Sequence, residues 1–339
     1  MRAAIYNPYF DTLGGGERYT IMFAKALANL GYKVDVQWSE TIRKRLENHF
    51  GIDLSEINFV KDIKRGDGYD VCFWLSDGSI PLLHARKNFL HFQFPFRNVS
   101  GKSLLNRMKL FRINKVICNS GFTKSFIDSE YQVNSFVLYP PVSVNLIKPK
   151  RKENIILFVG RFSQLTQSKN QHILVDAFKD LCSRGVHNWK LILAGGVEVG
   201  IDNYFEKLSK SIKGYPIEII KSPNFKELVS LYGKAKIFWS AVGFGADETL
   251  EPMKVEHFGI SVVEAMAGGA VPIVYNAGGY KETVEDGISG YLWNKKSILV
   301  KKTLELINKK VFSVISEKAI LASKKYGYEK FEKEIQKFI

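Results

Sequence analysis

Short apolar segments alternate with longer segments of helical periodicity along the whole chain. In the first half, runs rich in Val, Ile and Phe predict strands at residues 3–6, 34–38, 71–75, 89–93, 116–119 and 136–139. In the second half the same pattern predicts strands at 155–159, 190–194, 217–220, 237–240, 271–275 and 290–293. Helices are expected between them, for example at 17–30, 171–184 and 224–233. Apolar strands separated by helices predict an α/β fold of parallel sheets with helices on both faces.

The alternation pauses once, in a segment rich in proline and positive charge at residues 139–152. A chain of 339 residues usually forms more than one domain. We therefore expect two facing Rossmann-like domains, residues 1–147 and 148–339, with ligands in the cleft at the carboxyl ends of their strands. The last helical stretch, residues 313–339, carries aromatic side chains that can dock it, including back on the first domain.

Composition narrows the class of protein. Hydrophobic residues are 45% and charged residues 24% of the chain, which is ordinary for a soluble globular protein. No stretch of about 18 uninterrupted apolar residues occurs, and the N-terminus lacks the regions of a secretory signal, so we expect neither a membrane span nor secretion. Cys72, Cys118 and Cys182 lie far apart, which favours buried thiols in a reducing compartment over a disulfide framework or a zinc site.

The net charge of +15 favours anionic partners, and its distribution is uneven. Residues 78–127 contain no acid but nine cations, namely Arg86, Lys87, Arg97, Lys102, Arg107, Lys109, Arg112, Lys115 and Lys124. Residues 102–113 have apolar positions at helical spacing. One interpretation is an ordinary amphipathic helix that faces the core, with solvated cations outside. The other is an interfacial helix on an anionic membrane surface, with Arg107, Lys109 and Arg112 at the lipid.

The segment 256–269 carries the most specific candidate chemistry. A glycine turn at Gly259 precedes a short helix, whose first N–H groups and partial positive charge suit a phosphate or diphosphate. Glu256 precedes this helix, and Glu264 lies about 7 Å further along its axis. One ligand can therefore meet both carboxylates, with a sugar beside Glu256 and a ribose at Glu264. The alternative is a surface helix that buries one acid by accident.

This segment resembles the E-x7-E signature of retaining, nucleotide-sugar-dependent glycosyltransferases of family 4, which have the two-domain GT-B fold. Other pieces follow the order of that family, namely the glycine loop 14–16, the N-S-x-x-T turn 119–123, the segment 139–142, Arg161 with Lys169, Gly278-Gly279, Glu282, Asp286-Gly287 and Gly290. Two features depart from the pattern. Asn170 replaces a glycine after the lysine, and residues 243–254 are longer and more acidic than usual, which affects the sugar pocket.

The resemblance implies a reaction and assigns roles. A hexose-type sugar would pass from a nucleoside-diphosphate donor, held by the second domain, to a glycan or lipid-linked acceptor, held by the first. Arg161 and Lys169 would stabilise the departing diphosphate, together with amides near Gly259 and Ile260. The remaining donor contacts would come from Gly15, Gly16, Phe258 and Glu264, and Glu256 would act on the sugar. No metal or other cofactor is expected, because the cations take that role and the chain has no D-x-D motif.

His91 would contact the transferred sugar in this scheme, with His84 as the competing candidate. An isolated histidine among aromatic residues is otherwise a hydrogen-bonded core residue. The glycine loop has a similar alternative, because three glycines can form a flexible turn without a ligand. The resemblance implies a cytoplasmic protein, with a peripheral position on the inner face of the membrane as one form of it.

Other functions remain as alternatives. A nucleotide-sugar epimerase or a phosphorylase can use the same fold, and the charge alone permits a non-catalytic binder of nucleic acid or of an anionic surface. No nucleic-acid partner is expected, because no known nucleic-acid-binding module occurs in the sequence. The G-x-G-x-x-G, G-x-x-x-x-G-K-[ST] and G-x-S-x-G motifs are also absent, which argues against dinucleotide-dependent, P-loop and hydrolase chemistry.

Overall fold

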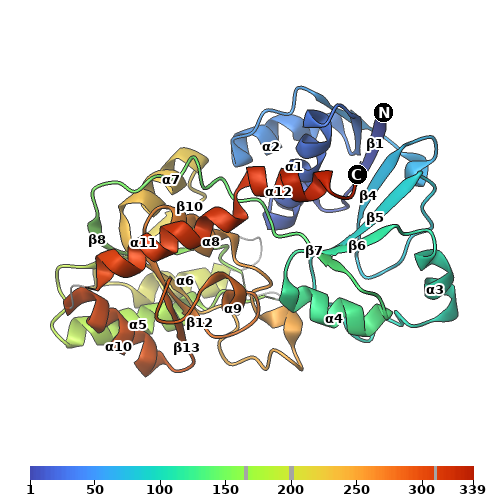
Figure 1. Ribbon diagram of the computed structural model, residues 1–339. Helices are drawn as coiled ribbons and strands as arrows, with labels where there is room; N and C mark the ends of the chain where they lie inside the picture. Colours follow the sequence, from blue (N-terminus) through green and yellow to red (C-terminus); the bar gives the residue numbers. More distant parts are fainter. Residues whose placement is uncertain (164–166, 198–201, 309–310) are drawn as a thin grey trace. The chain divides into compact units, whose positions relative to one another are not determined.

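The computed structural model describes residues 1–163, 167–197, 202–308 and 311–339 (Figure 1). It contains two compact units. The first consists of Met1–Pro141 together with Tyr328–Ile339, and the second is Val142–Gly327. The chain thus leaves the first unit after Pro141, rather than at residue 147. Its last helix joins the first unit, as the docking of this segment on the first domain would require.

The first unit is built on a parallel sheet with the strand order β3-β2-β1-β4-β5-β6-β7. Its strands are β1 (Arg2–Tyr6), β2 (Lys33–Gln37), β3 (Ile57–Val60), β4 (Val71–Leu75), β5 (Lys87–Phe92), β6 (Lys115–Cys118) and β7 (Phe136–Val137). The α-helices of this unit are α1 (Gly15–Asn29), α2 (Arg43–Phe50), α3 (Leu104–Leu110), α4 (Gly121–Tyr131) and α12 (Tyr328–Gln336). Its 3-10 helices are η1 (Phe10–Thr12), η2 (Glu40–Ile42) and η3 (Lys64–Gly66).

Helix α12 completes the core of the first unit beside α1 (Figure 1). Phe331 and Ile335 of α12 are 3% and 0% exposed and belong to the same apolar cluster as Tyr19 and Phe23 of α1. The ring of Phe331 meets that of Tyr19 edge to face, with centroids 5.3 Å apart. The last helix is therefore part of this core rather than a surface appendage.

The second unit repeats this architecture with the strand order β10-β9-β8-β11-β12-β13, again all parallel. Its strands are β8 (Glu153–Val159), β9 (Lys190–Gly195), β10 (Ile217–Lys221), β11 (Ala235–Ser240), β12 (Val271–Tyr275) and β13 (Tyr291–Trp293). The α-helices are α5 (Gln171–Ser183), α6 (Asp202–Ser211), α7 (Phe225–Lys234), α8 (Ile260–Ala267), α9 (Tyr280–Thr283), α10 (Lys296–Asn308) and α11 (Phe312–Ser323), and the 3-10 helices are η4 (Pro252–Lys254) and η5 (Lys324–Tyr326).

Both sheets have the doubly wound order 3-2-1-4-5-6, counted from the first strand of each unit, and the first sheet adds a seventh strand, β7, at its edge. The chain moves outward from β8 to β10 and then returns to the other side of β8 with β11. In such sheets ligands bind outside the carboxyl ends of the strands, at the point where the strand order reverses. In the second unit this switch point lies between β8 and β11.

The expected α/β class is confirmed, with one strand missing from the sequence prediction. Strand β3 lies at the edge of its sheet, and only Ile57 among its residues is buried. Its four residues, Ile-Asn-Phe-Val, carry an apolar pattern, but the run is short and is not among the strands predicted from the sequence.

The three cysteines are free, as their spacing predicts. Cys72 and Cys118 are buried, and Cys182 is partly buried. Burial raises the pKa of the Cys72 and Cys118 thiols to about 12. Among the helices that the structure describes, none has the length and apolar character needed to span a membrane.

Candidate active site

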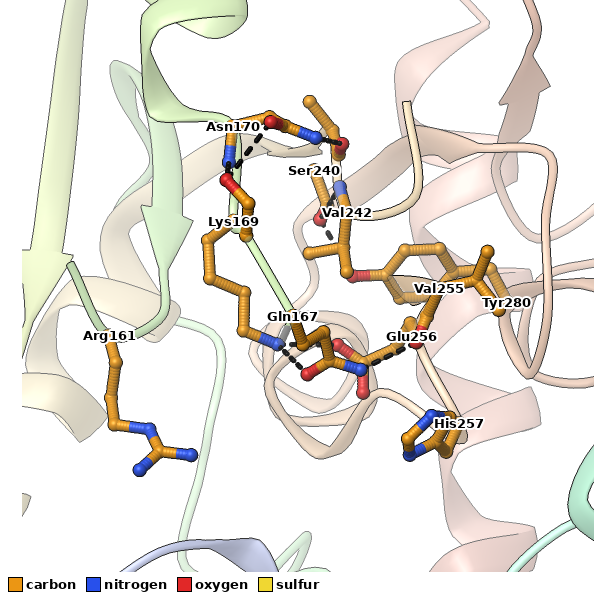
Figure 2. A network of polar contacts seen from close by, with 12 residues as sticks. Arg161, Gln167, Lys169, Asn170, Ser240, Val242, Val255, Glu256, His257 and Tyr280 are labelled. Carbon is orange, nitrogen blue, oxygen red and sulfur yellow. Dashed lines mark hydrogen bonds and ion pairs between the residues drawn. The ribbon is translucent and has the colours of Figure 1, made fainter. Parts of the chain in front are cut away.

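An ion pair between Lys169 and Glu256 lies at the switch point of the second sheet (Figure 2). Lys169 Nζ is 3.1 Å from Glu256 Oε2, and the two side chains are 15% and 18% exposed. Lys169 also donates a hydrogen bond of 2.6 Å to Gln167 Oε1, and the amide nitrogen of Gln167 donates to the Val255 carbonyl at 2.5 Å. Gln167 thus links the two segments that carry the ion pair, a role that sequence reasoning missed.

The charge of Glu256 is stabilised by its surroundings. Burial alone would raise the pKa of this carboxyl, but the positive charge of Lys169 and the influence of His257 act in the opposite direction. Hydrogen bonds from the Lys169 ammonium and the His257 backbone add to this effect. The net result is a pKa of Glu256 below its ordinary value, so the carboxylate is ionised at neutral pH.

Asn170 fixes the loop that carries Lys169. Its backbone is left-handed, with φ 51° and ψ 38°, directly before the first residue of α5. Glycine and asparagine are the residues that adopt this conformation most readily, which explains how Asn170 can replace the family's glycine. The Asn170 side chain also donates a hydrogen bond of 3.0 Å to the Ala241 carbonyl, just after β11. The lysine loop is therefore tied to the neighbouring strand.

The backbone of Glu256 rests on the Gly278-Gly279 turn that follows β12. The N–H of Gly279 donates to the Glu256 carbonyl at 2.7 Å. A Cβ atom at Gly278 would lie 2.1 Å from that carbonyl oxygen, and one at Gly279 would lie 2.3 Å from the His257 carbonyl oxygen. Only glycine permits this approach, so the glycine pair of the sequence motif supports the position of Glu256.

Helix α8 begins immediately beyond Glu256. Its N-cap, Gly259, has φ 98°, and a Cβ there would lie 2.7 Å from the Tyr280 ring and 3.6 Å from Glu256 Cγ. The first N–H groups of the helix, from Ile260 onward, therefore start close to the Glu256 side chain. Glu264 lies further inside α8 and is 7% exposed.

Phe258, an expected donor contact, has a buried side chain. It is 3% exposed, and its ring meets Tyr326 edge to face with centroids 5.1 Å apart. A side chain committed to this packing leaves only the Phe258 backbone for a ligand. Its contribution is to anchor the turn that precedes α8.

Tyr280 is a residue of the site that sequence reasoning missed. Its hydroxyl is 2.7 Å from Ser240 Oγ at the end of β11, and its side chain is 1% exposed. Burial, with the negative charge of Glu256 as a further cause, raises the pKa of Tyr280 well above its ordinary value. The tyrosine therefore remains neutral, and its ring lies against the Gly259 turn. Its position directly after the glycine pair is the only signal in the sequence.

Arg161 lies after β8 with an exposed side chain. Its carbonyl accepts a hydrogen bond of 2.9 Å from the amide of Gln171, the first residue of α5. Among the residues that the structure describes, no side chain or backbone group forms a hydrogen bond or ion pair with the Arg161 guanidinium. Figure 2 shows this side chain apart from the Lys169–Glu256 pair and without contacts to the network. It is thus available for an anionic ligand.

The acidic loop before Glu256 has structural contacts of its own. Glu248 accepts a hydrogen bond of 2.7 Å from the Gly278 N–H and pairs with Lys281. Glu251 pairs with Lys254 in the same loop. The extra acids are thus used to hold this loop and the glycine turn, rather than to add free negative charge beside Glu256.

The structure corrects the expectation for His91, which is a core residue of the first unit. Its side chain is 0% exposed and stacks on Tyr19 with ring centroids 4.1 Å apart. Neither ring nitrogen has a hydrogen-bond partner among the described residues. Burial lowers the pKa of His91 to about 3, against a weak opposing influence of the Ile117 backbone. His84, the competing candidate, is exposed and precedes β5, at the edge of the sheet opposite the carboxyl ends of the strands. It is therefore not placed to contact the transferred sugar either.

Gln93, rather than His91, lies against the glycine loop of the first unit. A Cβ at Gly16 would be 1.8 Å from Gln93 Oε1, so a larger residue there would have to displace the Gln93 amide. Gly14 is the N-cap of α1, and its N–H donates to the Glu17 carboxylate at 2.6 Å. Gly15 is the first residue of α1. The loop is therefore an ordered helix start, and its expected contact with a donor stays a prediction.

The N-S-x-x-T turn is a helix cap. Ser120 Oγ accepts a hydrogen bond of 3.0 Å from the Thr123 N–H at the start of α4. Asn119 donates from its side chain to the Gln93 carbonyl at 3.1 Å. This motif joins α4 to the end of β5 and thereby positions Gln93.

Comparisons with known proteins identify the family and the fold. Residues 145–324, more than half of the chain, match the family model described as glycosyl transferases group 1. An uncharacterized glycosyltransferase of Methanocaldococcus jannaschii is 31% identical over 220 residues, which cover 64% of this chain and 56% of that protein. The GDP-Man:Man(3)GlcNAc(2)-PP-Dol alpha-1,2-mannosyltransferase of Neurospora crassa is 28% identical over 173 residues, 45% of this chain and 28% of that enzyme. The matches thus span little more than half of these relatives' lengths, or less.

Solved structures share the fold over nearly the whole chain. A crystal structure of HepE from Anabaena in complex with UDP and glucose superposes with a TM-score of 0.77 at 17% identity, covering 99% of this chain and 98% of that one. The expected GT-B class of two parallel α/β units is thereby confirmed, as is the resemblance to glycosyltransferases. The chain belongs to the family of glycosyl transferases group 1.

Proposed function

We propose that this protein transfers a hexose-type sugar from a nucleoside-diphosphate sugar to a glycan or lipid-linked acceptor, with retention of the anomeric configuration. The observation that carries this proposal is the Lys169–Glu256 pair beside the start of α8. A cation, a carboxylate and a helix start lie together at the point where doubly wound sheets bind ligands. This set matches the three parts of the donor, which are its diphosphate, its sugar and the bond between them.

The charges of the site suit the charges that develop during transfer. The departing diphosphate gains negative charge, which Lys169, the Arg161 guanidinium and the amides at the start of α8 would stabilise. The anomeric carbon gains positive charge, and the ionised Glu256 would stabilise it or hold a sugar hydroxyl. Glu264, deeper in α8, would bind the ribose. We expect these cations to make a metal ion unnecessary, so activity should persist in EDTA.

The pairing of Lys169 with Glu256 has a further use in this scheme. Without a ligand, each charge neutralises the other, so neither is left unpaired in a partly buried position. An arriving diphosphate would share the ammonium, while the sugar would meet the carboxylate. The ion pair would thus prepare the site for the donor without a rearrangement of the backbone.

The names of the relatives support part of the proposed specificity. The N. crassa enzyme is named for a GDP-mannose donor and a dolichol-linked acceptor, and the solved HepE structure contains UDP. We infer a nucleoside-diphosphate sugar as the donor class and leave its base open. We expect a cytoplasmic location, peripheral on the inner face of a membrane, where lipid-linked acceptors are accessible.

A donor screen followed by product analysis tests the proposal. UDP-, GDP- and ADP-sugars are added singly, and a donor at 100 times its Kd should stabilise the fold by about 2.7 kcal/mol. Transfer should then depend on an added acceptor, and NMR should show the anomeric configuration of the donor in the product. Conversion without an acceptor would indicate an epimerase, and a requirement for inorganic phosphate would indicate a phosphorylase. No stabilisation by any nucleotide sugar would contradict the proposal, and an inverted product would contradict retention.

A further inference from the structure

Helix α3 exposes apolar side chains that an ordinary helix would bury. Leu104 is 75%, Leu105 62%, Met108 60% and Phe111 89% exposed, and α3 contains no buried residue. The interpretation of this segment as a helix that faces the core with its apolar side is therefore wrong. Figure 1 shows α3 apart from α1, α2 and α12 within the first unit.

The helix is nevertheless anchored. Ser103 caps it by accepting a hydrogen bond of 3.3 Å from the Asn106 N–H. Leu110 and Ile113 are partly buried and pack against the cluster that contains Phe92. Positions 104, 108 and 111, and likewise 105 and 108, lie three or four residues apart, so their exposed side chains share one side of the helix. Because the opposite face of the helix packs on the core, this apolar face stays exposed to solvent.

Positive charge surrounds the apolar face. Lys102, Arg107 and Arg112 are exposed, and Lys109 is partly exposed. The next acid along the chain, Asp128, pairs with Lys124. Glu130 accepts hydrogen bonds from the N–H groups of residues 98, 99 and 101, at 2.9, 3.0 and 3.1 Å. The charge of Glu130 is thus engaged by the backbone, with Lys102 as a further influence, which leaves Arg107, Lys109 and Arg112 without an ion pair among the described residues.

We infer that α3 and Phe111 form a docking surface for an anionic lipid membrane. The apolar side chains would enter the boundary between headgroups and acyl chains, and the cations would meet lipid phosphates. A second copy of this chain fits the surface less well, because it would place like charges against each other. Lipid satisfies both the apolar area and the charge, and the inference does not depend on the proposed reaction.

Vesicle binding tests the inference directly. The full chain should sediment with vesicles of phosphatidylcholine and phosphatidylglycerol but not with phosphatidylcholine alone. Binding should weaken strongly as salt rises toward about 0.5 M, because salt screens the attraction. Absence of binding at low salt, or equal binding to neutral vesicles, would overturn the inference.

Two variants with matched controls distinguish membrane binding through α3 from a general effect of the protein's net charge. Each cation near an anionic surface strengthens binding about fivefold, so R107S/K109S/R112S should bind about 100-fold more weakly. The control K207S/K210S/K213S removes the same charge from exposed lysines of the second unit and should bind nearly like wild type. L105S/M108S should also bind weakly, whereas V314S/L321S, with side chains 59% and 60% exposed on α11, should not. Equal effects of a variant and its control would contradict a local docking surface.

Insertion itself is measurable with Phe111→Trp. Lipids with brominated acyl chains should quench this tryptophan in phosphatidylglycerol-containing vesicles beyond the quenching of the wild type. Unchanged quenching would mean that α3 does not enter the lipid. If instead L105S/M108S alters only the oligomeric state, the surface is a contact between copies, and the lipid assignment is wrong. Nucleotide-sugar binding, followed by thermal shift, should be the same in all variants, which separates this test from that of the proposed reaction.

Discussion

Lys169 Nζ lies 3.1 Å from Glu256 Oε2, although 87 positions separate the two residues in the chain. The pair joins the segment after β8 to the segment before α8, across the switch point of the sheet. Its two charges are those that the proposed reaction needs, one for the diphosphate and one for the sugar. Changes on the two sides of the pair should therefore have different kinetic consequences.

Removal of the Lys169 ammonium should impair the chemistry. We expect Lys169→Ala to lower kcat/KM by about 10² or more, because one preorganised electrostatic donor is lost. Its affinity for the nucleoside diphosphate should fall as well. Lys190→Ala is a matched control, since Lys190 belongs to an exposed pair with Glu218, 3.9 Å apart, in the same unit. Steady-state kinetics that remain unchanged in both Lys169→Ala and Arg161→Ala would remove the diphosphate assignment.

The two glutamates should separate in their effects on binding and turnover. Glu264→Gln should weaken binding of the nucleotide with or without its sugar, because a ribose contact acts on substrate and transition state alike. Glu256→Gln should lower kcat instead, and it should not weaken a nucleoside diphosphate that lacks a sugar, because it leaves the Lys169 charge unopposed. Calorimetric titration with the nucleoside diphosphate provides the comparison. Equal losses of affinity in the two variants would show that the roles are not divided.

His91 should make the fold sensitive to acid. Its pKa falls from 6.5 in the unfolded chain to about 3 in the core, so the unfolded state binds the extra proton between these values. Stability contributed by the neutral imidazole is thus present above pH 6.5 and lost as the pH falls. From pH 7 to pH 5 the loss should be about 2 kcal/mol.

His91→Phe should remove this part of the acid sensitivity, because phenylalanine can keep the stacking on Tyr19 without titrating. Urea unfolding of both proteins at pH 7 and pH 5 measures the difference. His49, whose pKa is also lowered by burial, is present in both proteins and cancels. An equal loss of stability in wild type and variant would place the acid sensitivity elsewhere.

The contact between Gly16 and Gln93 should decide whether Gly16→Ala lowers or raises the free energy of unfolding, which a double-mutant cycle can show. Gly16→Ala should destabilise the wild type, because the new Cβ would lie 1.8 Å from Gln93 Oε1 in a packed position. In a Gln93→Ala background the same change should stabilise the fold by up to about 1 kcal/mol, since alanine favours a helix over glycine. Urea unfolding of the four proteins gives the coupling energy. Additive effects would mean that Gln93 does not occupy the space beside Gly16 in solution.

Much of the fold follows from the sequence because buried parallel strands leave continuous apolar runs. The motif around Glu256 and Glu264 is likewise local, with a spacing that a single helix explains. Gln167 and Tyr280 escaped notice because their roles depend on partners from other elements, the Val255 carbonyl and Ser240. Such contacts have no periodic signal.

The error at His91 has a physical cause of the same kind. Its strand position predicted that it would be accessible at the carboxyl end of the sheet. Tyr19 covers one face of its ring, and Phe331 packs against Tyr19 from a helix that the chain adds at its far end. Local patterns cannot show that residues from the start and end of a sequence enclose a residue between them.

The return of α12 to the first unit also sets an order of events during synthesis. A ribosome completes all the strands of the first unit before it begins the second, but Phe331 and Ile335 of the first core come last. While Val142–Gly327 is being translated, the apolar side chains of α1 that contact α12 lack part of their cover. The second unit has all of its strands and helices before then. The first unit is therefore translated before the second but completes its core after it.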